Sequence, residues 1–189
     1  MADSQEEQKA THALLHQLFS DYNTRLSLNS SSKILTSTPT LAASITSATS
    51  AIQTSYGPSI TIASEAPLPP NNDNTTTIPL TDLQMDTYTH AILALSRTST
   101  PSSILQTLKV VLYALRPKGV AIVIAPMGTG VEERIREMSR GKADGVRDVV
   151  EWAGFERGKI RGVEVEAEVE GEKVKGEVVL GMKWDQLTA

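Results

Sequence analysis

The chain has 189 residues, a formal net charge of −4 and a pI near 5.4, so it has no general attraction for nucleic-acid phosphate or for anionic lipid. It contains no cysteine, which excludes disulfides, iron–sulfur ligands, zinc thiolates and thiol nucleophiles within these residues. The segment MADSQEEQKATH is acidic and polar, unlike a secretory signal, and no apolar run approaches membrane-spanning length. We therefore expect a cytoplasmic or nuclear protein with one main domain, and with neither nucleic acid nor a membrane as its partner.

Residues 1–32 are predicted to form an N-terminal helical extension of the main domain, which covers residues 33–189. Residues 4–26 have the periodicity of a helix with apolar side chains on one face. These side chains are Ala13, Leu14, Leu18, Tyr22 and Leu26. We expect this helix to pack on the edge of the core.

The first half of the main domain predicts a strand at 33–37, a helix at 40–55 and a second strand at 59–63. Gly57-Pro58 separates the helix from the second strand. A flexible, exposed loop is expected at 65–80, because PLPPNNDNTTT consists of residues that favour neither helix nor strand.

The central stretch, residues 88–126, predicts a strand, a helix and another strand. Ala91 to Leu95 is apolar, and Thr100-Pro101 supplies a helix cap and a first-turn proline. Apolar residues then recur at three-and-four spacing, which gives the helix one face to seat on a sheet. Arg116-Pro117-Lys118-Gly119 ends the helix, and the apolar run after it is typical of a strand covered on both faces. The stretch is thus a βαβ unit.

The C-terminal part predicts two helices, at 131–140 and 146–153, and then an antiparallel hairpin. Valine and alanine alternate with glutamate from Val163 to Glu170, Gly171 permits a turn, and the chain returns over 173–184. We interpret the glutamate row as a solvated face whose charges meet lysines across the strands.

This order of elements and three short motifs resemble the class I S-adenosylmethionine-dependent methyltransferases. YTHAILAL at 88–95 stands in the place of the family's fourth strand, and LRPKGV at 115–120 is similar to its L-(R/K)-P-G-G turn. WAGF at 152–155 resembles the motif before its last hairpin. The resemblance covers about residues 33–184. It implies an α/β fold with a Rossmann-like, mostly parallel sheet and a C-terminal antiparallel hairpin.

The cofactor loop departs from that family. Its members bind S-adenosylmethionine on a glycine-rich turn after the first strand, but the turn at 36–40, TSTPT, has no glycine, and Pro39 also removes an amide donor. By position, the resemblance implies Ser37, Glu65 and Leu95 as cofactor-binding residues if the cleft holds a ligand. Glu65 would then hold the ribose hydroxyls.

The family's third strand, with its Asp-containing loop, is expected to be missing here. It is replaced by the proline- and asparagine-rich run, and Asp82 or Asp86 could substitute for the family's aspartate.

A retained scaffold with a lost cofactor loop is similar to the N-terminal domain of the anamorsin family of cytosolic iron–sulfur assembly factors, which serves as a docking module. The leading hypothesis is therefore a non-catalytic methyltransferase-like domain with a protein partner, no cofactor, no metal and no catalytic residue. Its partner would be an iron–sulfur assembly complex or the catalytic subunit of a methyltransferase. The alternative is an active S-adenosylmethionine-dependent small-molecule methyltransferase, or an accessory protein that holds a biosynthetic intermediate.

Three weaker patterns are interpreted as structural. His12 and His16 have the spacing of a metal-binding pair but no evident third ligand. His90 could act as a base near the substrate, yet a lone histidine at a strand start is more often structural. Gly128-Thr129-Gly130 could hold an anion, but the rest of the dinucleotide fingerprint is absent.

Overall fold

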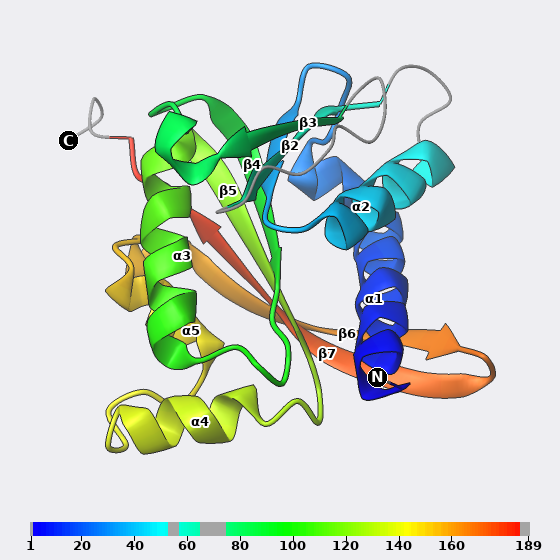
Figure 1. Cartoon of the computed structure of the whole chain (residues 1–189), viewed down its shortest axis with the longest axis vertical. Coiled ribbons are helices and arrows are strands. Elements are labelled where there is room, and N and C mark those ends of the chain that lie inside the picture. Colours follow the sequence, from blue (N-terminus) through cyan, green and yellow to red (C-terminus); the bar gives the residue numbers. More distant parts are fainter. Residues whose placement is uncertain (1, 53–56, 65–74, 186–189) are drawn as a thin grey trace.

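The computed structural model describes residues 2–52, 57–64 and 75–185, which form one sheet with helices on both faces (Figure 1). The seven strands lie in the order β3-β2-β1-β4-β5-β7-β6. The strands are β1 (Lys33–Thr36), β2 (Ser59–Ser64), β3 (Thr75–Pro79), β4 (Tyr88–Ala94), β5 (Leu115–Pro126), β6 (Ile160–Val169) and β7 (Glu172–Met182). The helices are α1 (Ala2–Leu26), α2 (Pro39–Ile52), α3 (Pro101–Ala114), α4 (Val131–Met138) and α5 (Val146–Trp152), with short 3₁₀ turns η1 (Leu80–Asp82) and η2 (Arg157–Lys159).

The predicted α/β class is confirmed. Strands β1 to β5 pair in parallel, whereas β7 runs antiparallel to both β5 and β6. Parallel neighbours require crossover connections, and α2 and α3 supply two of them. The reversal at β7 places the C-terminal hairpin where the alternating valines and glutamates predicted it.

The central βαβ unit forms because its boundaries are encoded locally. Thr100 caps α3 through a reciprocal capping box with Ser103, and Pro101 occupies the first turn. At the other end, the pairing of β4 with β5 shifts register between Tyr88 and His90, opposite the Arg116–Gly119 turn. The helix therefore ends at Ala114 and the strand begins directly after it, earlier than position 120 predicted from the apolar run.

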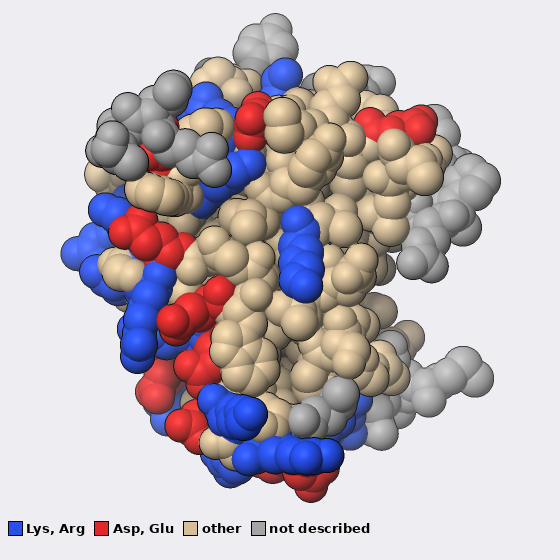
Figure 2. Space-filling model, turned by 90° about the vertical axis from the view of Figure 1, so that its left-hand side faces the viewer, with Lys and Arg blue, Asp and Glu red and all other residues tan. Residues whose placement is uncertain are grey.

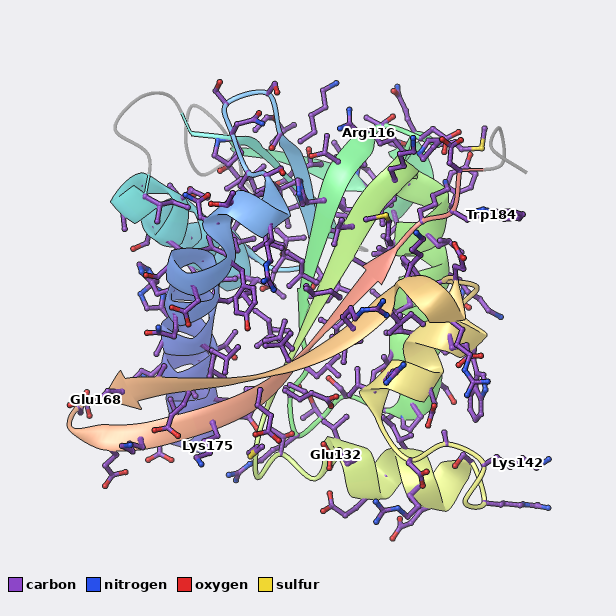
Figure 3. All side chains as sticks on the ribbon, turned by 180° about the vertical axis from the view of Figure 1, so that it is seen from behind. Arg116, Glu132, Lys142, Glu168, Lys175 and Trp184 are labelled. Atoms are coloured by element: carbon purple, nitrogen blue, oxygen red, sulfur yellow. The ribbon has the colours of Figure 1, made fainter. Side chains whose placement is uncertain are left out.

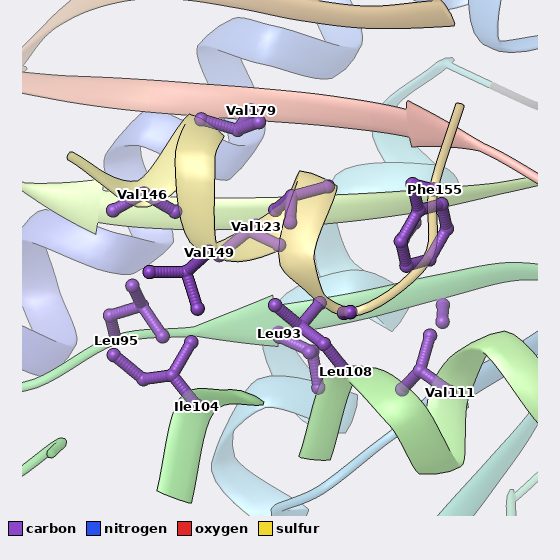
Figure 4. Packing of buried hydrophobic residues seen from close by; sticks show 14 of the residues in the cluster. Leu93, Leu95, Ile104, Leu108, Val111, Val123, Val146, Val149, Phe155 and Val179 are labelled. Carbon is purple, nitrogen blue, oxygen red and sulfur yellow. The ribbon is translucent and has the colours of Figure 1, made fainter. Parts of the chain in front are cut away.

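The core lies in two layers, one on each face of the sheet. On one face, side chains of α3 and α5 pack against β4, β5 and β7, as seen for Leu108, Val149 and Val123 in Figure 4. On the other face, α1 and α2 cover the opposite sides of the same strands. Burial on both faces explains why β5 is apolar from Val120 onward.

Helix α1 is part of the core, and the prediction that it packs on the core's edge was wrong. Leu14, Leu18 and Phe19 are fully buried, and the helix contacts α2, β5, β6 and β7. It approaches β7 so closely that a Cβ on Gly176 would lie 2.5 Å from Leu14 Cδ1. The hairpin extends beyond the sheet and supports α1, as Glu168 and Lys175 show near its end in Figure 3.

The third strand is present, contrary to the sequence prediction. Thr75–Pro79 pairs in parallel with β2, so the later part of the expected 65–80 loop is strand β3 followed by η1. Residues 65–74 lie outside the described part of the chain. The strand was missed because it consists mainly of threonine at the sheet edge, where a polar strand costs little.

Candidate functional site

The candidate site lies along the carboxyl edge of the parallel strands, where open α/β sheets bind ligands. Three cavities of about 400, 210 and 440 Å³ follow one another along this edge. Ser37 lines the first and second cavities, and Glu7 lines the second and third. The three hollows are therefore neighbours along one edge, of a size that suits small ligands.

The turn after β1 is short and already uses its polar groups within the protein. Only Ser37 and Thr38 separate β1 from α2. The Thr38 side chain accepts a hydrogen bond from the Leu41 N–H at 3.2 Å, and its carbonyl accepts one from the Ala42 N–H at 3.0 Å. Pro39, the first helical residue, has no N–H. At this helix start the Leu41 and Ala42 amides are therefore used within the protein, and Pro39 supplies no donor.

Two of the three predicted cofactor-binding residues lie together. Ser37 is exposed, and both Ser37 and Leu95 line the 210 Å³ cavity. Leu95 is buried and donates its N–H to the Ile124 carbonyl at 2.8 Å, so its backbone amide is committed to the sheet. Glu65 lies outside the described residues.

The start of α1 lies over this edge and is held there by two ion pairs. Glu7 Oε1 accepts the Arg97 N–H at 3.1 Å and lies 3.3 Å from Arg97 Nε. Lys9 pairs with Glu170 at the hairpin tip. These contacts join residues far apart in the chain, so no local pattern in the sequence could have indicated them.

Arg134 connects the loop after β4 with the loop after β5, and no pattern in the sequence indicated this role. Its guanidinium donates to the carbonyls of Thr129, Ser96 and Ser99 at 3.0, 3.3 and 3.3 Å. Thr129 is itself buried and donates to the Pro126 carbonyl at 3.0 Å. The Thr129 side chain and carbonyl thus form hydrogen bonds within the protein.

His90 has hydrogen-bond partners within the protein, at the opposite end of β4 from the carboxyl edge. His90 is buried, its Nε2 lies 2.8 Å from the Leu26 carbonyl, and its Nδ1 lies 2.8 Å from Thr89 Oγ1. Burial lowers the pKa of His90 more than the Leu26 carbonyl raises it. Because this residue lies in the first half of β4, at the opposite end from the carboxyl edge, it cannot serve as a base there.

His12 and His16 join α1 to α2. Their rings lie 4.4 Å apart, and each is 3.1 Å from a serine hydroxyl of α2, Ser44 and Ser47 respectively. Burial lowers the pKa of His16, and the neighbouring His12 lowers it further. In the described part of the chain, no three His, Asp or Glu side chains converge as metal ligands would.

The two aspartates proposed as substitutes lie at opposite ends of the sheet. Asp82 is exposed in η1, directly after β3. Asp86 pairs with Lys183 at 2.7 Å on the amino side of β4 and therefore has no place in the site.

Among the described helices, none combines the length and apolar character that crossing a bilayer requires.

No family model matches the sequence, and no curated protein matches it either. Solved structures do match. A chain in the complex of the Haloferax volcanii Trm112 methyltransferase activator with its methyltransferase aligns over 97% of this chain and 94% of its own, with 12% identity and a TM-score of 0.59. The 1,6-didemethyltoxoflavin-N1-methyltransferase of Burkholderia thailandensis, solved with S-adenosylhomocysteine, aligns over 92% and 80%, with 12% identity and a TM-score of 0.55.

A Galdieria sulphuraria protein described as a sarcosine dimethylglycine methyltransferase gives a TM-score of 0.55 at 12% identity, over 90% of this chain and 85% of its own. At such identities the likeness concerns the fold alone. Together with the observed strand order, it shows that the chain has the class I S-adenosylmethionine-dependent methyltransferase-like fold.

Proposed function

We propose that this chain is a methyltransferase-like domain that does not bind S-adenosylmethionine and acts through contacts with another protein. The observation that carries the proposal is the two-residue turn between β1 and α2. The Thr38 hydroxyl and carbonyl oxygens accept hydrogen bonds from the N–H groups of Leu41 and Ala42 in the first turn of α2. Pro39 has no N–H. An anionic ligand at this helix start would find no donor at Pro39 and would compete with Thr38 for the Leu41 and Ala42 amides.

Neither His90 nor Asp86 supplies an acid or a base at the carboxyl edge. His90 is buried at the other end of β4, and Asp86 is engaged with Lys183. Methyl transfer needs two bound substrates more than it needs acid–base groups. Cofactor binding is therefore the property that distinguishes an active methyltransferase from a docking domain.

The test is a calorimetric titration of the whole chain with S-adenosylmethionine and, separately, with S-adenosylhomocysteine. We expect no saturable heat and no rise in melting temperature at millimolar ligand. A ligand at 100 times its Kd would stabilise the fold by about 2.7 kcal/mol, which thermal unfolding detects.

Ser37→Trp provides the matched variant, because this exposed residue lines two of the cavities. Saturable binding to the unmodified chain that Ser37→Trp abolishes would overturn the proposal and indicate an adenosyl site. Heats that are equally small for both proteins would support it.

A second candidate is a domain that holds a small ligand, or an active methyltransferase, because two of the cavities at the edge reach about 400 Å³. Native mass spectrometry after gentle purification distinguishes it. A retained adduct of constant mass would favour this candidate over the docking domain.

The proposed partner belongs to one of two classes, an iron–sulfur assembly complex or the catalytic subunit of a methyltransferase. Copurification from the native source separates the two. The first predicts recovery of cysteine-rich assembly proteins, whereas the second predicts recovery of methyltransferase activity with the pair but not with this chain alone.

A further inference from the structure

Helix α3 presents an outer face that is almost free of charge. The chain as a whole is 21% charged, yet the 14 residues of α3 include a single charged side chain, Lys109. The other exposed residues on the helix are neutral, namely Ser102, Ser103, Gln106, Thr107 and Tyr113. Figure 2 views this side of the molecule and shows a broad uncharged surface with one isolated basic side chain, while other charges gather along its margins.

Two hollows flank this helix. One is the 400 Å³ cavity between α3 and the sheet, to which Leu35, Leu93 and Val110 contribute apolar surface. The other, about 180 Å³, lies where α3 meets α4 and α5, and Leu105 and Trp152 line it. A helix between two apolar hollows forms a ridge that a complementary groove or helix can engage.

Large apolar side chains are exposed around the ridge. Tyr113, in the last turn of α3, is 52% exposed, and Trp152, at the end of α5, is 48% exposed. Met85 is 58% exposed, and the residue after it, Asp86, donates its N–H to the Tyr113 carbonyl. Trp152 adjoins Glu151, which pairs with Arg157, and Met85 adjoins Asp86, which pairs with Lys183, so these side chains border the uncharged surface. Exposed tyrosine, tryptophan and methionine beside a weakly charged surface are typical of protein interfaces.

The covering of the sheet explains why the larger hollow is open. On this face α3 and α5 cover β4, β5 and β7. Between β3 and β4 the chain has only η1 and the short segment after it, so β1 and β2 receive no α-helix from that connection. The wall beside α3 is closed by Leu80 and Leu83 alone among the residues of this connection.

The charge of Lys109 indicates which kind of partner fits this face. Among the side chains that the structure describes, no carboxylate lies within ion-pair distance of it. A second copy of the chain docked symmetrically through α3 would place the two Lys109 ammonium groups toward each other, and like charges at an interface oppose association. A partner surface that is apolar with one central carboxylate would instead satisfy this cation.

We infer that the α3 face, defined as Lys109, Gln106, Tyr113, Trp152 and the two hollows, docks an amphipathic helix of a partner protein whose apolar side carries one Asp or Glu. Helix-in-groove recognition uses such apolar anchors at three-and-four spacing. The inference rests on the proposed function, since it names the surface through which the domain would make its protein contact.

The test uses two synthetic helical peptides about four turns long, the length of α3. Both carry leucine and alanine on one side, and they differ only in a central glutamate or lysine. Binding is followed by fluorescence anisotropy with the unmodified chain and with Lys109→Glu. We expect the glutamate peptide to bind more tightly to the unmodified chain and the lysine peptide more tightly to Lys109→Glu, each by roughly fivefold, as for one exposed ion pair.

Two controls keep the result specific to this face. Lys33→Glu changes an exposed lysine at the start of β1 and should leave the peptide preference unaltered. Tyr113→Ala with Trp152→Ala should weaken binding of the glutamate peptide at least fivefold. Met127→Ala, which changes a 53% exposed residue directly after β5, should not. Circular dichroism checks that each variant is folded.

The inference is overturned if neither peptide binds, if both bind equally, or if Lys109→Glu leaves the preference unchanged. It is also overturned in favour of a homodimer if light scattering shows a dimer that Gln106→Arg dissociates. Saturable S-adenosylmethionine binding together with the expected peptide preference would defeat the proposed function but leave the docking surface standing. No S-adenosylmethionine binding together with no peptide preference would defeat only the docking surface.

Discussion

At the residue scale, the Arg116–Gly119 turn in the first part of β5 depends on one glycine. A Cβ on Gly119 would lie 2.8 Å from the Arg116 carbonyl oxygen and 3.1 Å from that of Tyr88, and both are backbone atoms that cannot move aside. Gly119→Ala should therefore lower the free energy of unfolding by about 1–3 kcal/mol, the usual range for overpacking. Urea denaturation measures this change.

Gly57→Ala is the matched control, because no atom lies within 4 Å of the Cβ it would add. The control should change stability little. Equal effects of the two substitutions would show that the close approach at Gly119 is not what the turn requires.

Glu177 illustrates the cost of placing like charges together. It pairs with Glu164 across the hairpin, and burial raises its pKa, with Glu132 raising it further while Arg147 acts in the opposite direction. A raised carboxyl pKa means that the charged form destabilises the folded state at neutral pH, and this penalty disappears as the pH falls below the folded pKa.

Glu177→Gln should consequently raise the melting temperature at pH 7 by roughly 1–3 °C, and by less near pH 4. Calorimetric scans at the two pH values check this. Glu168→Gln, an exposed glutamate on β6 opposite Lys173, should give no gain. A gain of the same size at both pH values would contradict the electrostatic explanation.

At the scale of elements, α1 and its neighbours should respond to acid through histidines. The pKa values of His16 and His90 are lowered, chiefly by burial, so both favour the neutral form in the folded state. Their contribution to stability is present above the unfolded value of about 6.5 and is lost as the pH falls through the lower folded pKa.

The free energy of unfolding should therefore decrease from about pH 7 to pH 5, and His16→Gln should reduce the slope. Urea midpoints measured across this range test the prediction. Glu177, whose pKa burial raises, acts in the opposite direction as the pH falls, so the comparison with His16→Gln is what isolates the histidine contribution. A free energy of unfolding that does not change with pH, or a slope that His16→Gln leaves unchanged, would show that these histidines do not make the stability depend on pH.

Elements with local signals could be predicted from the sequence, and those without could not. Thr100-Pro101 marked the start of α3, and alternation marked the hairpin, because each signal lies within the segment itself. Strand β3 carried no apolar signal, since its pairing with β2 comes from the fold rather than from its threonines. The site followed the same division. The glycine-free turn could be read directly, whereas the contact of Glu7 with Arg97 spans 90 positions.

At the scale of the whole molecule, the first helix packs in the same core as the sheet. Leu14, Leu15, Leu18 and Phe19 are fully buried against the sheet. Burying four such side chains contributes roughly 6–12 kcal/mol at about 1.5–3 kcal/mol each. We therefore expect the stability of the sheet to depend on α1.

Removing residues 1–32 should therefore abolish cooperative unfolding instead of leaving a stable methyltransferase-like domain, because β5, β7 and α2 would lose their cover. A milder change tests the same point in a chain that still folds. Leu18→Ala should cost about 2–5 kcal/mol in urea denaturation, as for a leucine in a well-packed core. Gln17→Ala, on the same helix but with a side chain that bonds only Asp21, should cost less than about 1 kcal/mol. If Leu18→Ala were as mild as Gln17→Ala, or if the shortened chain melted cooperatively, α1 would be an extension after all, and the sheet would have to be stable with one face uncovered.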